Sequence, residues 1–205
     1  METEDEQVEK LKAWLKENGM SIVIGIVLGV GGIAGYNYWT HMQETTAEQA
    51  SDHYRQMIAA LESGNGDSVQ QQADILIADY AATEYAQLAQ LALARHYVDS
   101  SRFEDAASAL QSVVGSAAQD PLAYVARTRL AAVQIELQRY DDAMATLSAD
   151  FPEEFAAMVD ELRGDALASQ GRTDEAVAAY RKAQQASPAN PEFLRQKLND
   201  LGSSG

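Results

Sequence analysis

RFEDA at residues 102–106, RYDDA at 139–143 and RTDEA at 172–176 are three copies of one five-residue motif, and their last residues are 37 and 33 positions apart. Each copy ends in two acidic residues and an alanine. Acidic side chains are favoured in the first turn of a helix, where they meet the positive end of the helix dipole. The small alanine lets that helix pack closely on another, and in the first two copies an aromatic residue, Phe103 or Tyr140, fills the turn before it. The motif therefore predicts helix pairs that recur about every 34 residues.

The sequence around the motif predicts helices nearly throughout. Beyond His41, apolar residues recur at i, i+3, i+4 and i+7 between short polar turns, which is the spacing of amphipathic helices. A degenerate fourth copy precedes the others: Ala73 lies 33 positions before Ala106 and follows the GNG turn at 64–66. Residues 192–201 are expected to form a closing helix that covers the end of the stack. Its apolar residues are Phe193, Leu194, Leu198 and Leu201.

This period and motif resemble the tetratricopeptide repeat. The last copy carries residues at the consensus spacing of that repeat, namely Gly164, Gly171, Ala176, Tyr180, Ala183 and Pro188. Arg163 stands where leucine is usual, and Pro152 is expected to cut short the second helix of the middle copy. The resemblance implies an all-α fold, in which a solenoid of about four helix pairs ends in a capping helix.

The composition excludes several classes of function. The 205 residues include 31 acidic and 15 basic side chains, which gives a formal net charge of −16 and opposes binding to nucleic acid. The chain has no cysteine, and no two of its three histidines stand at i, i+4, so no metal site is predicted. His53 and His96 are expected on solvated surfaces. No nucleophile elbow or Gly-rich phosphate loop is present, so we expect no enzyme, no cofactor and no small-molecule substrate.

Residues 20–39, MSIVIGIVLGVGGIAGYNYW, carry no charge. As a helix they would span about 30 Å, which is the thickness of a bilayer core. Aromatic residues that favour the headgroup layer lie before this stretch, at Trp14, and at its end, at Trp39. A cleaved signal peptide is the alternative. It would need a basic start, whereas residues 1–17 contain six acids and three lysines. We therefore predict a retained transmembrane signal anchor.

Basic residues set the expected orientation. Three lysines precede the span, at 10, 12 and 16, and one basic residue follows it through Arg55. The positive-inside rule then predicts a cytoplasmic segment at 1–19 and an exported repeat domain at 40–201. In a Gram-negative cell, this is a single-pass inner-membrane protein with a periplasmic domain. Residues 202–205 are expected to be a flexible tail.

Small residues line one face of the predicted span. Gly25, Gly29, Gly32 and Tyr36 are spaced by 4, 3 and 4 positions. Such a face allows another membrane helix to approach closely. The alternative is that these glycines pack against nothing in particular, because glycine is common in membrane helices.

A partner groove is expected on the first helices of the repeats, which line the concave side of such a stack. The repeat register gives the facing residues as Leu88, Leu91, Arg95, Val98, Val125, Thr128, Ala132, Ile135, Glu136, Met158, Glu161 and Asp165. They form an apolar floor with an acidic far end, suited to a segment with apolar and basic groups. The alternative is that Leu88, Leu91 and Val125 are buried between helices.

The whole chain resembles the YfgM family of ancillary subunits of the SecYEG translocon. The segment 17–19 running into 27–31, then Tyr38 and Trp39, resembles the anchor of that family, and 163–167 with Gly171 resembles its last repeat. The resemblance implies a non-enzymatic subunit at the protein-export channel. It also implies partnership with the membrane-anchored chaperone PpiD, and a role in passing exported client chains to periplasmic chaperones.

Two other functions stay open at this point. The domain could be a scaffold for another envelope assembly, with no client chains. It could also be a membrane-bound regulator that sequesters a signalling protein through its cytoplasmic segment.

Overall fold

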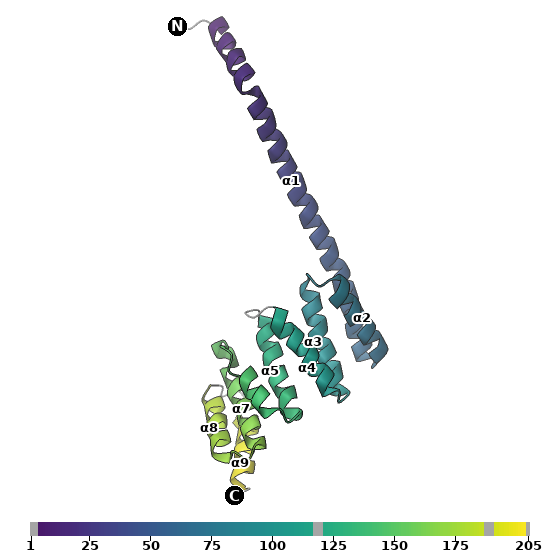
Figure 1. Cartoon of the computed structure of the whole chain (residues 1–205), viewed down its shortest axis with the longest axis vertical. Helices are drawn as coiled ribbons and strands as arrows, with labels where there is room; N and C mark the ends of the chain where they lie inside the picture. The colour runs from purple at the N-terminus through teal and green to yellow at the C-terminus, as the bar shows by residue number, and fades with distance from the viewer. Residues whose placement is uncertain (1–3, 117–120, 187–190, 204–205) are drawn as a thin grey trace. The chain divides into compact units, whose positions relative to one another are not determined.

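A computed structural model describes residues 4–116, 121–186 and 191–203, and over these ranges the chain is helical, without strands (Figure 1). This confirms the predicted all-α class. The elements are α1 (Glu4–Glu62), α2 (Gly66–Asp79), α3 (Glu84–Asp99), α4 (Phe103–Ser116), α5 (Pro121–Glu136), α6 (Tyr140–Thr146), the short 3-10 helix η1 (Glu153–Phe155), α7 (Ala156–Ser169), α8 (Thr173–Ala186) and α9 (Pro191–Ser203). The chain divides into two compact units, Met1–Gln49 and Ala50–Gly205.

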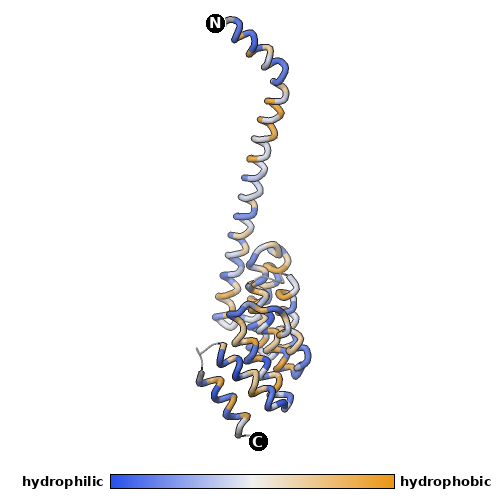
Figure 2. The backbone as a smooth tube through the Cα atoms, turned by 90° about the vertical axis from the view of Figure 1, so that its left-hand side faces the viewer, coloured by the Kyte–Doolittle hydropathy of each residue, from blue (hydrophilic) through white to orange (hydrophobic). Residues whose placement is uncertain are grey.

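The first unit contains the apolar stretch of α1, which is coloured by hydropathy in Figure 2. In the part of the chain that the structure describes, α1 is the one helix long and apolar enough to cross a membrane, and its apolar window is not buried. Large apolar side chains such as Leu28 and Ile33 are 70% and 65% exposed. A helix with apolar residues on all sides and no protein around them is suited to lipid.

The second unit consists of helix pairs whose internal turns share one geometry. The residue two positions before each second helix begins has a positive φ: Gly64 (71°), Ser101 (57°), Gln138 (59°) and Gly171 (74°). The next amide donates to the carbonyl five residues earlier, in the pairs Asn65–Ala60 (2.9 Å), Arg102–Tyr97 (2.7 Å), Arg139–Gln134 (2.8 Å) and Arg172–Leu167 (2.9 Å). This left-handed closure satisfies carbonyls at the end of the first helix. Because the turn at Gly64 matches the others, the predicted fourth copy is confirmed.

The other parts of the motif also take the positions that the sequence predicts. The motif alanines Ala106, Ala143 and Ala176, and Ala73 of the degenerate copy, are fully buried. The acidic pairs lie in the first turns of α4, α6 and α8. Phe103 is half-buried against the core at its turn.

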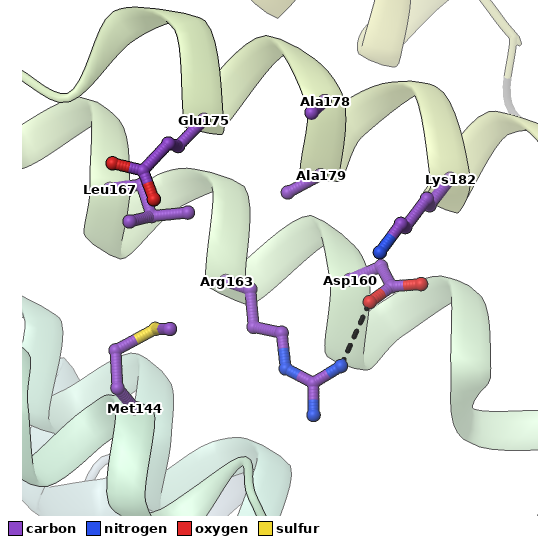
Figure 3. Close-up of a pocket in the computed structure, with 8 residues that line it drawn as sticks. All are labelled: Met144, Asp160, Arg163, Leu167, Glu175, Ala178, Ala179 and Lys182. Carbon is purple, nitrogen blue, oxygen red and sulfur yellow. Dashed lines mark hydrogen bonds and ion pairs between the residues drawn. The ribbon is translucent and has the colours of Figure 1, made fainter.

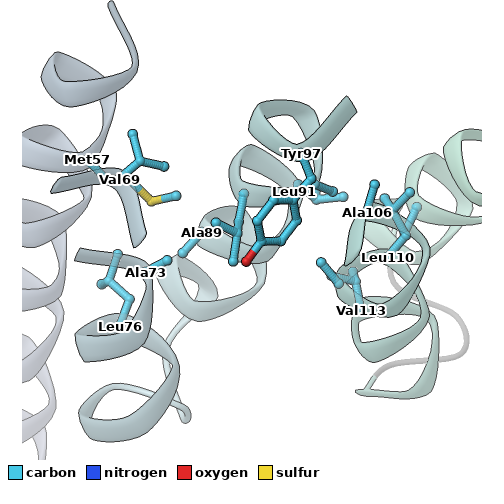
Figure 4. Close-up of a cluster of buried hydrophobic side chains, with 14 of the residues drawn as sticks. Met57, Val69, Ala73, Leu76, Ala89, Leu91, Tyr97, Ala106, Leu110 and Val113 are labelled. Atoms are coloured by element: carbon cyan, nitrogen blue, oxygen red, sulfur yellow. The ribbon is translucent and has the colours of Figure 1, made fainter. Parts of the chain in front are cut away.

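The core consists of three clusters along the unit. The first extends from the end of α1 to α5 and includes Met57, Leu76, Leu91 and Leu110 (Figure 4). The second joins α5, α6 and α7 around Ala143, Leu147 and Val159. The third joins α7, α8 and α9. Each helix packs mainly on its neighbours in sequence, as in a solenoid.

The middle pair departs from the regular pattern. Its second helix, α6, has seven residues and ends at Thr146, ahead of Pro152, so the predicted shortening is confirmed. After this short helix, Phe151 and Phe155 pack against each other and against Tyr124 of α5, at ring-centroid distances of 5.7 to 6.2 Å.

Helix α9 closes the stack in the place expected for a capping helix. Leu194 is buried against the third cluster, and Leu198 and Leu201 are half-buried there. Phe193 differs from the prediction because its side chain is 48% exposed. The helix continues to Ser203, two residues into the predicted tail, while Pro188 and residues 204–205 lie outside the described residues.

Candidate partner-binding site

A cavity of about 330 Å³ opens between α3, α4 and α5. Its lining residues are Ala94, Arg95, Val98, Leu110, Arg129, Ala132 and Val133. Helices α3 and α5 are the first helices of successive pairs, so the cavity lies on the side where the groove is predicted. Of the predicted residues, Arg95, Val98 and Ala132 meet here. The structure adds Arg129, which the repeat register did not select.

Two predicted groove residues belong to the packing between helices instead. Leu91 is 6% exposed and lies in the first core cluster. Thr128 is 3% exposed, and its hydroxyl donates to the carbonyl of Val125 at 3.0 Å. The prediction that Leu91 and Thr128 lie on an accessible surface is therefore wrong. Both are covered because α3 and α5 are each packed between other helices. Leu88 and Val125 are half-buried.

The remaining predicted residues are spread along the stack. Ile135 is half-buried against the second core cluster, and Glu136 is exposed at the end of α5. Met158 is 52% exposed on α7. Glu161 and Asp165 are half-buried on the same helix.

The acidic far end of the predicted groove is already occupied by a residue of the chain itself. The ammonium of Lys197 on α9 lies 2.6 and 2.8 Å from the two carboxylate oxygens of Asp165 and 2.9 Å from Glu161. The Tyr180 hydroxyl donates to Asp165 at 2.7 Å. Burial, the hydrogen bond to Asp165 and the nearby acidic charges raise the pKa of Tyr180 above its ordinary value. The expectation of a basic partner group at this end is therefore corrected: Lys197 takes that place.

Arg163 has a structural role that its unusual position in the repeat did not reveal. Its guanidinium donates to Asp160 at 2.9 Å and to the carbonyl of Leu147, just after α6, at 2.7 Å. Figure 3 shows this side chain between Met144 on α6 and Asp160, beside a cavity of about 250 Å³. Since a short helix leaves carbonyls without partners at its end, Arg163 supplies one donor.

In the described part of the chain, no group of three or more His, Cys, Asp or Glu side chains could hold a metal ion. The expected solvated position of His53 is wrong: the ring is half-buried, with Nδ1 2.8 Å from Gln72 Oε1 and its centroid 5.5 Å from that of Tyr80. His96 is half-buried as well, and its ring faces Gly66 of the preceding pair.

No described side chain covers the glycines of the predicted packing face of α1. A Cβ atom added at Gly25, Gly29 or Gly32 would meet no described atom within 4 Å. Tyr36 on the same face is 64% exposed and lies 6.4 Å from Trp39 between ring centroids.

A family model described as a tetratricopeptide repeat-like domain matches residues 12–203. The chain is 36% identical over 202 residues to a protein of Escherichia coli named "Ancillary SecYEG translocon subunit", covering 98% of this chain and 97% of the relative. The chain belongs to the family of ancillary SecYEG translocon subunits. A Haemophilus influenzae member of that family is 32% identical and covers 97% of both chains.

Solved structures agree with the fold of this family member. A chain of MamA from Desulfovibrio magneticus aligns with a TM-score of 0.61 and 16% identity, covering 78% of this chain and 86% of the other. A tetratricopeptide repeat protein from Parabacteroides merdae aligns with a TM-score of 0.53 and 17% identity, covering 85% of this chain and 66% of the other. At these identities, the likeness concerns the fold alone.

Proposed function

We propose that this subunit acts at the inner membrane as a non-enzymatic accessory of the SecYEG translocon, with residues 40–203 in the periplasm. In this role, the repeat domain binds a PpiD-type chaperone and exported client chains and helps to pass those clients to periplasmic chaperones. The observation that carries the proposal is the likeness to named translocon subunits over nearly the whole chain, anchor and repeats together. The lysines before the apolar stretch support the orientation.

The two surfaces have separate tasks in this proposal. The face of Gly25, Gly29, Gly32 and Tyr36 packs against a membrane helix of the channel, where close approach of small residues favours association. The groove residues that remain accessible bind the periplasmic partner. The main contact site is the cavity lined by Arg95 and Val98.

Photo-crosslinking in intact membranes tests the proposal. A photoreactive residue at Gly29 should capture a channel subunit, whereas one at Val27, on the opposite side of α1, should not. A second photoreactive residue at Val98, which is 37% exposed, should capture the chaperone or exported chains. The control for Val98 is Arg181, an exposed residue of α8. Capture of one unrelated envelope complex at both Gly29 and Val98 would contradict the translocon role.

The orientation is tested by thiol labelling. Since the chain has no cysteine, Lys12→Cys and Thr45→Cys each introduce a single thiol without background. A membrane-impermeant maleimide added to cells with a permeabilised outer membrane should label the variant at residue 45 and leave the variant at residue 12 unlabelled. The reverse pattern would show the opposite orientation.

A further inference from the structure

The cavity between α3 and α5 carries positive charge on a strongly acidic domain. Residues 40–205 contain 25 acidic and 12 basic side chains. Seven residues line the cavity, and two of them are arginines while none is acidic. One arginine comes from each of the two first helices, Arg95 from α3 and Arg129 from α5. The charge of the cavity is therefore opposite in sign to the net charge of the domain around it.

Both guanidiniums are available to a partner. The side chain of Arg95 is 79% exposed, and its Nε lies 3.7 Å from a carboxylate oxygen of Asp99, which is itself 64% exposed. An ion pair this long and this exposed contributes little to stability, so a partner carboxylate can replace it. Arg129 is exposed and makes no hydrogen bond or ion pair with the residues that the structure describes. Glu136, one helical turn beyond Ala132, is the acidic residue of α5 nearest to the cavity in sequence.

The floor of the cavity is apolar. Ala94, Val98, Leu110, Ala132 and Val133 supply it. Its volume is at the lower end of the range for ligand sites, about 300–1,000 Å³, which suits one or two aliphatic side chains. A planar guanidinium binds a carboxylate through two parallel hydrogen bonds, so the two arginines can fix acidic groups on either side of a buried aliphatic one.

We infer that this cavity binds an extended partner segment in which an aliphatic side chain is flanked by carboxylates. This deepens the proposed partner-binding role, on which it rests, and it reverses the charge that the repeat register predicts. The register places Glu161 and Asp165 in the groove and so favours a basic segment. Lys197 already pairs with both carboxylates of that acidic end, and the accessible charges that line the cavity are cationic.

Fluorescence anisotropy on the full chain in lipid nanodiscs tests the inference. The acidic probe is a labelled peptide, Gly-Ser-Asp-Leu-Val-Asp-Ser-Gly. The neutral and basic probes replace both aspartates with asparagine or lysine. The acidic probe should bind about tenfold more tightly than the neutral probe and more tightly still than the basic one. Its affinity should fall as salt rises from about 50 to 300 mM, because exposed charges are screened.

Two double variants with the same change in net charge provide the contrast. Arg95→Glu with Arg129→Glu should weaken the acidic probe at least about tenfold and favour the basic probe. Arg181→Glu with Arg195→Glu, on exposed positions of α8 and α9, should leave the affinity within about twofold. Circular dichroism should show unchanged helix content in both.

Several outcomes would overturn the inference. They are equal affinity for the acidic and neutral probes, an acidic-probe affinity unchanged by the Arg95 and Arg129 reversals, or no saturable binding of the acidic probe below about 1 mM. Displacement of the probe by decanoate as readily as by unlabelled peptide would assign the cavity to acyl chains instead. If one of these outcomes is found while the photoreactive residue at Val98 still captures the chaperone or clients, the inference fails and the proposed function stands. If that capture is lost while the acidic peptide still binds, the proposed function fails and the peptide-binding inference stands.

Discussion

Gly164 of α7 lies directly under the aromatic ring of Tyr180 on α8. A Cβ atom at this glycine would come within 2.4 Å of Tyr180 Cε1, closer than real Cβ contacts. Gly164→Ala should therefore force the ring or the helix aside and lower the free energy of unfolding by about 1–3 kcal/mol. Chemical denaturation measures the change. The matched control is Gly115→Ala on α4, where no described atom lies within 4 Å of the added methyl group, and this variant should be as stable as the parent or slightly more so.

Because of Tyr180, we also expect the folded protein to lose stability at alkaline pH. Burial first, and then the hydrogen bond to Asp165, raise the pKa of this phenol above its ordinary value of 10.0. The unfolded chain ionises the tyrosine near pH 10, while the folded chain keeps the proton. The folded state thus binds more protons above pH 10, and the free energy of unfolding falls there by up to about 1.4 kcal/mol per pH unit.

The control for this pH effect is Tyr180→Phe. It should be less stable at neutral pH, because Asp165 loses a donor, but its free energy of unfolding should fall less steeply between pH 10 and 11. Since burial also raises the pKa of Tyr54, a residual slope should persist in this variant. Parallel slopes for the two proteins would contradict a raised pKa at Tyr180.

At the scale of the element, the left-handed turns are occupied by two kinds of residue. Glycine adopts the positive φ at positions 64 and 171, whereas Ser101 and Gln138 carry a side chain there. Ser101→Gly and Gln138→Gly should each stabilise the unit by about 0.5–1 kcal/mol, because the strain of a left-handed residue exceeds the entropic cost of glycine. Ser100→Gly, at a neighbouring position with φ of −95°, should be destabilising. Thermal denaturation of all three variants distinguishes strain relief from a general effect of glycine.

Lys197 is expected to contribute to the docking of α9. Its ammonium pairs with Asp165 and Glu161 and lies 4.7 Å from the ring centroid of Phe193. Lys197→Ala would leave two half-buried carboxylates facing one another, so it should cost about 1–3 kcal/mol and increase the protease sensitivity of α9. Lys182→Ala on the exposed face of α8 is the control and should cost less than about 0.5 kcal/mol. Equal effects of the two variants would show that the ion pair does not hold α9.

At the scale of the whole molecule, the division of the core into three clusters predicts uneven stability. Gly164→Ala weakens the third cluster, so amide exchange in α7, α8 and α9 should become about tenfold faster or more. Exchange in α2, α3 and α4 should stay within about twofold, because their core lies in the first cluster. A uniform increase over all helices would mean that the solenoid opens as one cooperative unit.

The sequence predicted those features that depend on nearby residues. Ala106 and its counterparts, the acidic first turns and the copy at residue 73 follow from spacing and local chemistry, and the structure confirms them. The site could be predicted only in part. Periodicity places Leu91 and Arg95 on the inner face of α3, but it does not show how far neighbouring helices cover that face, so the burial of Leu91 stayed an open alternative. The partners of Lys197 lie 32 and 36 residues away, and no local pattern specifies them.

The position of the first buried residue bears on how this protein could leave the membrane. Residues 6–49 contain no buried side chain in the described structure, and Ala50 is the first that is fully covered. A proteolytic cut between residues 42 and 49 would therefore remove no side chain of the three core clusters. The product would be a folded, diffusible fragment that keeps the cavity beside Arg95. Under the proposed function, the released fragment would compete with the intact protein for the same partners.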